Sequence, residues 1–316
     1  ALAEAMPVAD APVVARMRAA GAIPLARTNL PEMGLRITTD NPLRGRTNNP
    51  WDITRTAGGS SGGEGASLAT GMSPFGLGND IGGSLRNPAY CCGIAALKPT
   101  TGRIPFVPSI PGASQPNSFR LMCVEGPMAR SVADLKIAYR VLSGWHPQDP
   151  YSVPAALEGP AVARKVALVT QMPNSPLPAA TIAAIHQAGE HLRAEGWQVE
   201  EVAPPELARV NEIWARVLVS DLQNMLPLMT SIMSEGTLGA LTHFVQEFDP
   251  AAMNGTQLYL ERDRLAVAWS AFFQQHPLVI GPTWADLPFL HDADIDPDTG
   301  METMMRRLQF ITPGNL

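Results

Sequence analysis

Residues 58–103 read GGSSGGEGASLATGMSPFGLGNDIGGSLRNPAYCCGIAALKPTTGR. Two glycine-rich loops lie in this stretch, GGSSGG at 58–63 and DIGGS at 80–84, and their serines Ser60 and Ser84 are 24 residues apart. Acyl transfer to a serine needs room for a planar carbonyl group to approach and backbone N–H groups that face the developing oxyanion. The pair of loops therefore indicates serine-based acyl-transfer chemistry, whereas a lone GGSSGG would indicate a linker.

The second loop has the features of an oxyanion site. Successive small residues allow the backbone N–H groups of Ile81, Gly82, Gly83 and Ser84 to converge on a negative charge. A serine nucleophile also needs a group that accepts its proton. No histidine lies near either loop, because all six histidines come after residue 145. A second serine that passes the proton to a lysine fits these residues better.

The stretch resembles the amidase signature family, whose members hydrolyse amides with a Ser–Ser–Lys triad. The resemblance rests on GGSSGGEGA at 58–66 and NDIGGSLRNPA at 79–89, which occur in the family's order and spacing. Two further segments are also similar to the family, TDNPLRGRTNNPWD at 39–52 and FRLMCVEGPMARSVADL at 119–135. Agreement of several elements in order is far more specific than a single glycine loop.

The resemblance implies roles for the two serines and for the loop around Ser84. Ser84 corresponds to the nucleophile, and Ser60 to the bridging serine, which follows a cis peptide bond. The backbone N–H groups of Ile81, Gly82 and Gly83 would form the oxyanion hole. The implied reaction is hydrolysis of a carboxamide C–N bond through an acyl-enzyme on Ser84.

Three further residues receive supporting roles from the same resemblance. Ser61 would help to hold the first loop, while Asp80 and Arg86 would pair and brace the nucleophile turn. The substrate stays open, since the family acts on small aliphatic and aryl amides, peptide amides, lactam oligomers, fatty amides and tRNA-linked glutamine. Residues 39–52 and 119–150 resemble free-standing bacterial amidases, which speaks against the tRNA-linked substrate.

The base that the resemblance implies is absent from residues 1–316. The only lysines are Lys98, Lys136 and Lys165, and the resemblance gives Lys98 a structural role. The family lysine corresponds to a position before Ala1, so we expect an amidase truncated at both ends. Two alternatives stay open: an amidase-like binding or scaffold protein without a base, and a fragment that does not fold stably because sheet edges remain unpaired.

Composition and charge limit the binding partners and the cellular location that we expect. A net charge of −6 without blocks of like charge predicts neither nucleic acid nor a membrane surface as a partner. No apolar run approaches the roughly 18 residues of a spanning helix, and no signal-peptide pattern is present. Three cysteines provide no disulfide framework, so the expected location is the cytoplasm. We expect a small-molecule amide substrate and no cofactor or metal, and a homodimer stays open.

The predicted fold class is α/β, and the resemblance implies a mixed β-sheet core covered by helices on both faces. We expect one incomplete domain over residues 1–316, in which a variable, mostly helical region at 205–275 shapes the substrate pocket. Hydrophobic periodicity and turn residues predict helices at 11–20, 63–72, 131–143 and 180–195, and strands at 23–27, 75–78, 166–171, 197–202 and 278–281. The strand–helix–strand order at 166–202 predicts a βαβ unit.

Overall fold

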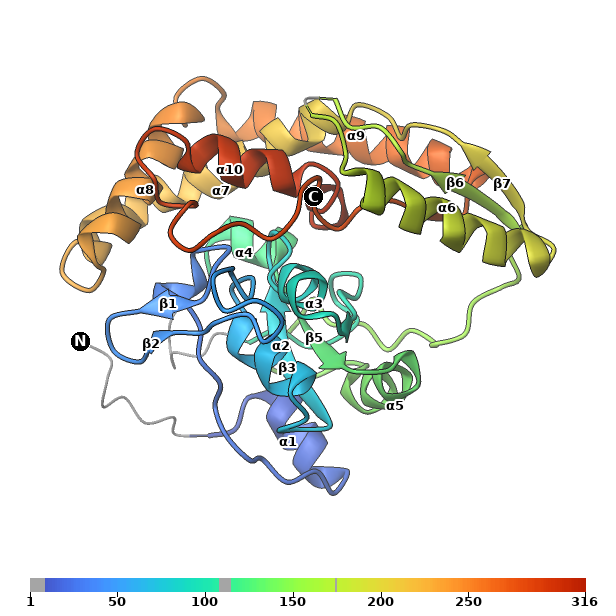
Figure 1. Ribbon diagram of the computed structural model, residues 1–316, viewed down its shortest axis with the longest axis horizontal. Coiled ribbons are helices and arrows are strands. Elements are labelled where there is room, and N and C mark those ends of the chain that lie inside the picture. The colour runs from blue at the N-terminus through green and yellow to red at the C-terminus, as the bar shows by residue number, and fades with distance from the viewer. Residues whose placement is uncertain (1–8, 108–114, 174) are drawn as a thin grey trace.

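The computed structural model describes residues 9–107, 115–173 and 175–316, so the start of the predicted domain at 1–8 lies outside the described residues. Helices and short strands alternate in the N-terminal half (Figure 1). The helices are α1 (Pro12–Ala19), α2 (Gly62–Ala69), α3 (Arg86–Cys92), α4 (Asn117–Met122) and α5 (Val132–Leu142), with a 3₁₀ turn η1 (Glu32–Gly34). The strands are β1 (Asp40–Asn41), β2 (Gly45–Arg46), β3 (Phe75–Asp80), β4 (Ala95–Ala96) and β5 (Val124–Ala129).

Strands β3, β5 and β4 form an antiparallel sheet in that order, with β5 in the middle. Leu68 of α2 packs with Leu85 and Met128 on one face of this sheet. On the other face, Leu77 of β3 contacts the apolar cluster that α1 and α5 contribute. Helices therefore cover both faces, and β3 ends at Asp80, where the second serine loop begins.

A parallel sheet forms the second half of the α/β framework. It contains β6 (Lys165–Leu168) between β7 (Gln198–Glu201) and β8 (Leu278–Ile280). Helix α6 (Ala179–Ala194) connects β6 to β7, which confirms the predicted βαβ unit. Gly189 of α6 allows a close approach to the sheet, since an added Cβ would lie 2.7 Å from a Leu168 methyl group.

The α/β class is confirmed, but two details differ from the expectation. Within the described residues the strands lie in three separate sheets, of two, three and three strands, and the antiparallel and parallel pairings do not share one sheet. The predicted strand at 23–27 was wrong. Ile23 and Leu25 are 81% and 68% exposed, and residues 23–27 pair with no strand of the described chain, so their apolar side chains have no sheet face to cover.

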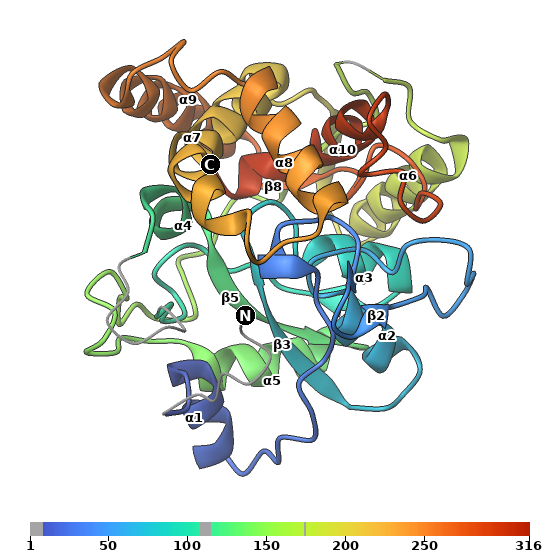
Figure 2. The same ribbon diagram turned by 90° about the vertical axis from the view of Figure 1, so that its left-hand side faces the viewer.

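The C-terminal half adds a helical layer above the antiparallel sheet (Figures 1 and 2). It consists of α7 (Leu207–Met229), α8 (Glu235–Glu247), α9 (Gly255–Gln275) and α10 (Gly300–Leu308), followed by a 3₁₀ turn η2 (Thr312–Gly314). Helix α7 provides much of the largest apolar cluster through a continuous buried face. None of the helices in the described residues is both long and apolar enough to span a bilayer.

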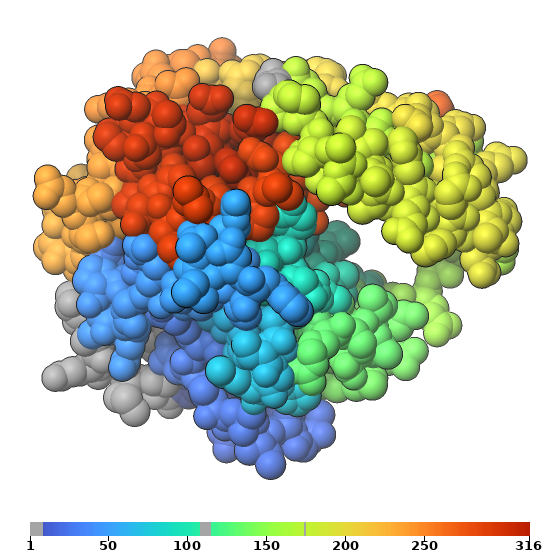
Figure 3. Space-filling model, in the orientation of Figure 1, coloured from blue at the N-terminus to red at the C-terminus, as the bar shows by residue number. Residues whose placement is uncertain are grey.

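The C-terminal helical layer packs on the N-terminal half, which contains the serine loops. The βαβ unit at 165–201 is separated from the N-terminal half by an open space. In Figure 3 the C-terminal segment, coloured red, contacts the blue and cyan surface of the N-terminal half. An open space separates the yellow-green surface of the α6 region from the green surface of α5 in the same view. Hydrogen bonds between the two halves are concentrated around the serine loops, helices α7 and α8 and the C-terminal segment.

Candidate active site

The two serine loops lie against each other at the start of helices α2 and α3. The backbone N–H of Ser61 donates to the carbonyl oxygen of Ser84 at 3.2 Å. Ser60 and Ser84 are 4% and 7% exposed, so both serines lie beneath the surface beside this contact. The Gly59–Ser60 peptide bond is cis, as the resemblance implies. The Ser61 hydroxyl lies over the backbone of Gly78, where an added Cβ would be 2.5 Å from Oγ.

Backbone contacts fix the first loop from the side of residues 36–39. An added Cβ at Gly59 would lie 2.6 Å from backbone atoms of this segment, so a larger residue does not fit there. The Thr39 hydroxyl donates to the Gly58 carbonyl oxygen at 2.9 Å and accepts from the Gly62 N–H at 3.0 Å. Thr39 therefore closes the loop that carries Ser60, a role that the sequence did not indicate.

Asp80 braces the second loop from its fully buried position at the end of β3. Its carboxylate accepts from the Gly83 N–H at 2.7 Å and from the Leu85 N–H at 3.2 Å. Arg86 donates to both carboxylate oxygens, at 2.9 and 2.8 Å. Burial on its own raises the pKa of Asp80, but the charge and hydrogen bonds of Arg86, with those of Asn315 and Gly83, lower it well below its usual range. Asp80 and Arg86 thus pair as expected.

The backbone N–H groups of the second loop fall into two kinds. Within the described residues, the N–H groups of Ile81, Gly82 and Ser84 donate to no protein acceptor. The Gly83 N–H differs, because it is engaged by Asp80. The expected oxyanion donor Gly83 is therefore occupied, whereas three neighbouring N–H groups are free to bind a ligand.

Each of the three free N–H groups belongs to a peptide unit whose carbonyl oxygen is held by a hydrogen bond. The three bonds run from Asn315 Nδ2 to Asp80 O at 3.2 Å, from Trp214 Nε1 to Ile81 O at 2.8 Å, and from the Asn87 N–H to Gly83 O. In a trans peptide unit the C=O and N–H bonds point in opposite directions. Holding the carbonyl oxygen on one side therefore sets the direction of the N–H on the other.

Asn87 also connects the two loops through its side chain. Its Nδ2 donates to the Gly59 carbonyl oxygen at 3.2 Å, and its Oδ1 accepts from Trp284 Nε1 at 2.6 Å. Both Asn87 and Trp284 are fully buried. Because both the Nδ2 and the Oδ1 atoms of Asn87 have hydrogen-bond partners, its side chain holds the two loops together.

Besides Thr39, sequence reasoning missed four residues of this arrangement: Asn87, Trp214, Trp284 and Asn315. Asn87 lies inside the quoted motif, where a polar residue between Arg86 and a proline was a usable signal. The other three form hydrogen bonds with partners 133 or more residues away, and no periodicity or local motif predicts a hydrogen bond at that separation.

Two of the three lysines in the described residues bind partners other than the serine pair, and the third is exposed. Lys98 Nζ donates to the Pro99 carbonyl oxygen at 2.7 Å, and burial lowers the pKa of Lys98 to about 8. Lys165 forms an ion pair with Glu200 at 2.9 Å, and Lys136 is exposed. Across residues 9–107, 115–173 and 175–316, no lysine or histidine nitrogen is hydrogen-bonded to either serine, and no group of three or more acidic, His or Cys side chains is arranged to hold a metal ion.

A cavity of about 430 Å³ lies beside Ser84. Ile81, Gly82 and Ser84 line it, so the residues that carry the free N–H groups border one space. Its walls are mainly apolar and come from α7, α8 and α10: Trp214, Leu218, Leu222, Leu241, Phe244, Met301, Met304 and Leu308. A pocket of this size and lining suits a small, largely apolar molecule.

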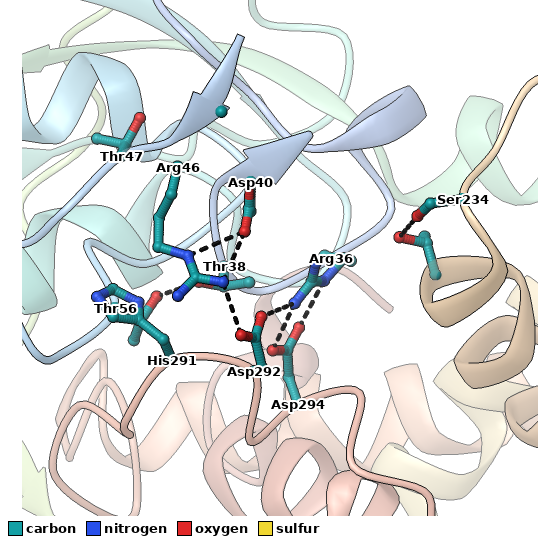
Figure 4. Close-up of polar contacts among 12 residues, drawn as sticks. Arg36, Thr38, Asp40, Arg46, Thr47, Thr56, Ser234, His291, Asp292 and Asp294 are labelled. Carbon is teal, nitrogen blue, oxygen red and sulfur yellow. Dashed lines mark hydrogen bonds and ion pairs between the residues drawn. The ribbon is translucent and has the colours of Figure 1, made fainter. Parts of the chain in front are cut away.

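Arg36 and Asp294, which both line the cavity, form an ion pair (Figure 4). Arg36 donates to both oxygens of Asp294 at 2.9 Å, and the two side chains are almost fully buried. Asp292 lies 3.6 Å from Arg36 and 2.6 Å from Arg46, so it extends the pair toward the surface. Burial lowers the pKa of Arg36, but the two aspartates outweigh it and raise the pKa above its usual value.

The same N-terminal segment also holds helix α8, the opposite wall. The Glu32 carboxylate accepts from the Ser234 N–H at 2.8 Å and from the Thr237 hydroxyl at 2.7 Å, and it also accepts from the Ser234 hydroxyl (Ser234 is visible in Figure 4). Glu32 thus caps the N-terminus of α8 from a distant part of the chain. Residues 32–36 therefore connect two walls of the cavity.

Comparison with known proteins places these loops in a family. The family model described as Amidase matches residues 1–316. This chain belongs to the amidase family. It is 38% identical over 312 residues to an indoleacetamide hydrolase of Bradyrhizobium diazoefficiens, an alignment that covers 97% of this chain and 60% of that protein. The chain therefore spans about 60% of the length of this amidase relative.

Two comparisons lead to a second amidase. The chain is 46% identical over 147 residues to a 6-aminohexanoate-cyclic-dimer hydrolase of Paenarthrobacter ureafaciens, covering 46% of this chain and 29% of that protein. A solved structure of 6-aminohexanoate cyclic dimer hydrolase complexed with substrate superposes with a TM-score of 0.79 at 27% identity. That superposition covers 96% of this chain and 69% of the solved chain. The amidase-signature fold expected from the motif is thus confirmed.

Proposed function

We propose that this chain carries the nucleophile and the substrate pocket of an amide hydrolase that acts through an acyl-enzyme on Ser84. The observation that carries the proposal is the junction of the two loops, where Ser61 N–H binds Ser84 O and the three residues with free N–H groups, Ile81, Gly82 and Ser84, line one cavity. Family membership supports amide hydrolysis as the reaction class.

The proposed reaction begins when Ser84 Oγ bonds to the amide carbonyl carbon and its proton passes through the Ser60 hydroxyl to a base. The backbone N–H groups of Ile81, Gly82 and Ser84 hold the oxyanion, so Gly83 supports the loop through Asp80 and does not donate to the substrate. The C–N bond then breaks and the amine leaves with a proton. Water attacks the ester and releases the carboxylic acid with Ser84 restored.

The proposed base is the lysine that the amidase resemblance implies, at a position before Ala1 in the full-length protein. The 60% coverage of the indoleacetamide hydrolase by this chain leaves room for it in a protein of that length. Without a base, the same pocket would make an amidase-like binding protein, because cooperating members of a catalytic triad fail together.

The proposed substrate is a small primary amide with an apolar aromatic acyl group, such as indole-3-acetamide. The mainly apolar walls of the 430 Å³ cavity favour such a group. The similarity to an indoleacetamide hydrolase supports the same class.

The test measures ammonia release from indole-3-acetamide by the full-length protein and three serine variants. We expect Ser84→Ala to lower kcat by about four orders of magnitude or more and Ser60→Ala by about 10²- to 10⁴-fold. Ser67→Ala is the matched control, because within the described residues the Ser67 hydroxyl hydrogen-bonds only to Ser73, at 3.2 Å. Hydrolysis by Ser84→Ala at the parent rate would refute the proposal, and substrate binding without turnover in the parent would favour the binding protein.

A further inference from the structure

The peptide unit between Ile81 and Gly82 is held at only one point within the described residues. The Gly82 N–H has no protein acceptor, while the Ile81 carbonyl oxygen accepts from Trp214 Nε1 at 2.8 Å. Because the two bonds of this trans unit point in opposite directions, the indole N–H determines where the Gly82 N–H points. The tryptophan lies 133 residues away in the sequence, on helix α7.

Packing and hydrogen bonding act together at this point. The Trp214 ring lies directly over Gly82, where an added Cβ would be 2.4 Å from ring atom Cζ2. Trp214 is 3% exposed and packs against Phe244 of α8, with ring centroids 6.3 Å apart. The ring therefore has little freedom to move away from the loop.

Helix α7 is itself fixed one turn before the tryptophan. Asn211 donates to the Gln309 carbonyl oxygen at 2.8 Å and accepts from the Thr312 hydroxyl at 2.7 Å. The same C-terminal segment supplies the Ile311 carbonyl oxygen that accepts from Arg86 at 2.7 Å. Trp214 thus reaches the second serine loop from a helix that is anchored beside that loop.

We propose that Trp214 is a positioning residue for the oxyanion hole, and that it transmits filling of the cavity to the Gly82 N–H. Trp214 lines the cavity together with Ile81 and Gly82, so an apolar acyl group bound there packs on the indole and keeps it against the loop. Substrates with such a group gain in kcat as well as in KM. This inference rests on the proposed function, since it assumes that Ser84 attacks a carbonyl in this cavity.

The experiment compares Trp214→Phe with Trp269→Phe in the full-length protein. Trp214→Phe keeps the aromatic packing and removes the N–H donor. Trp269→Phe makes the same chemical change where the buried indole Nε1 has no partner in the described residues. We expect Trp214→Phe to lower kcat for indole-3-acetamide about tenfold or more, with KM changed less than threefold, because removing one oxyanion donor outright costs about 10²- to 10³-fold and misdirecting it costs part of that. Trp269→Phe should change both less than twofold.

Two binding measurements distinguish a Trp214 that orients the Gly82 N–H from a Trp214 that only forms part of the cavity wall. An arylboronic acid forms a tetrahedral adduct with Ser84 and needs the oxyanion donors, whereas indole-3-acetic acid needs only the pocket. Trp214→Phe should raise the Kd of the boronic acid about tenfold and the Kd of indole-3-acetic acid less than threefold. Equal weakening of both, or a changed KM with an unchanged kcat, would overturn the inference.

A second variant covers the case in which Trp214→Phe does not fold. Gly82→Ala breaks the same contact from the loop side, and we expect the same selective loss of kcat and of boronic acid binding. Retention of the parent kcat by Gly82→Ala would also overturn the inference. Failure of the proposed function itself is seen separately, as hydrolysis by Ser84→Ala at the parent rate.

Discussion

Replacing Asp80 by asparagine should lower the free energy of unfolding by about 3–5 kcal/mol, the usual loss when one partner of a buried ion pair is removed. Asp80 is fully buried and accepts from Gly83, Leu85 and Asn315 as well as from two nitrogens of Arg86. An asparagine keeps one acceptor oxygen and turns an NH₂ group toward these donors, so the guanidinium charge loses its partner.

The loss is measurable as a shift of the melting temperature. The entropy of unfolding is about 2 cal/mol/K per residue, or about 0.7 kcal/mol/K for 316 residues, so the expected decrease in Tm is about 4–7 °C. Asp10→Asn is the matched control, because Asp10 and Arg18 form an exposed pair at 2.8 Å. Such pairs contribute about 0–1 kcal/mol, so its Tm should change by less than about 1.5 °C.

The stability difference between the parent and Asp80→Asn should decrease as the pH falls. The pKa of Asp80 is lower in the folded protein than in the unfolded chain, so the unfolded chain binds the proton first as the pH falls. The stability that ionised Asp80 contributes is fully present above the unfolded pKa of about 3.9 and is lost as the pH falls below it. Urea unfolding at pH 7, 5, 4 and 3 should therefore show the gap between parent and Asp80→Asn narrowing toward pH 3. A variant as stable as Asp10→Asn at pH 7, or a gap that widens in acid, would refute the reasoning.

Three further predictions concern the walls of the cavity. Asp294→Ala removes the bidentate partner of the buried Arg36, which keeps only the longer contact with Asp292, and should destabilise the protein by about 3 kcal/mol in urea unfolding; a loss below 1 kcal/mol would contradict burial of the pair. Glu32→Gln weakens the cap at Ser234 and should cost about 0.5–2 kcal/mol in the same assay, and an unchanged midpoint would speak against the cap. Ala240→Phe places a phenyl group in the cavity lining and should raise KM for indole-3-acetamide about tenfold or more while changing KM for acetamide little. Equal effects on both amides would show that the acyl group binds elsewhere.

The parts of the fold that the sequence predicted are those set by neighbouring residues. The helix expected at 131–143 forms as α5, and Ser131 caps it by accepting from the Asp134 N–H at 3.1 Å. The βαβ unit at 165–201 likewise follows from an alternation of apolar strands and an amphipathic helix. The segment at 23–27 has strand-like composition but finds no pairing partner in the described residues, and a strand forms only where its backbone can pair.

The candidate site likewise contains residues from one local motif and residues from distant segments of the chain. Ser60, Ser84, Asp80 and Arg86 lie within 27 residues, so one motif includes both loops and their internal ion pair. The groups that direct the free N–H groups come from elsewhere, since Trp214 lies 133 residues from Ile81 and Asn315 lies 235 residues from Asp80. Their roles depend on how α7 and the C-terminal segment pack, which a single sequence does not encode in any local pattern.

Because helix α7 contributes both to substrate binding and to the orientation of a backbone N–H, kcat and substrate preference should vary together. Helix α7 supplies both a wall of the cavity and the donor that holds the Ile81 carbonyl oxygen. A substitution that shifts α7 near Trp214 should therefore change kcat along with substrate preference. Leu222 lines the same cavity two turns further along α7 and contacts no atom of the loop through a hydrogen bond, so Leu222→Ala should alter KM for bulky amides and leave kcat for acetamide within about threefold. If Leu222→Ala lowered kcat for acetamide as much as Trp214→Phe does, the helix as a whole would set the rate, and the indole N–H would have no special part in it.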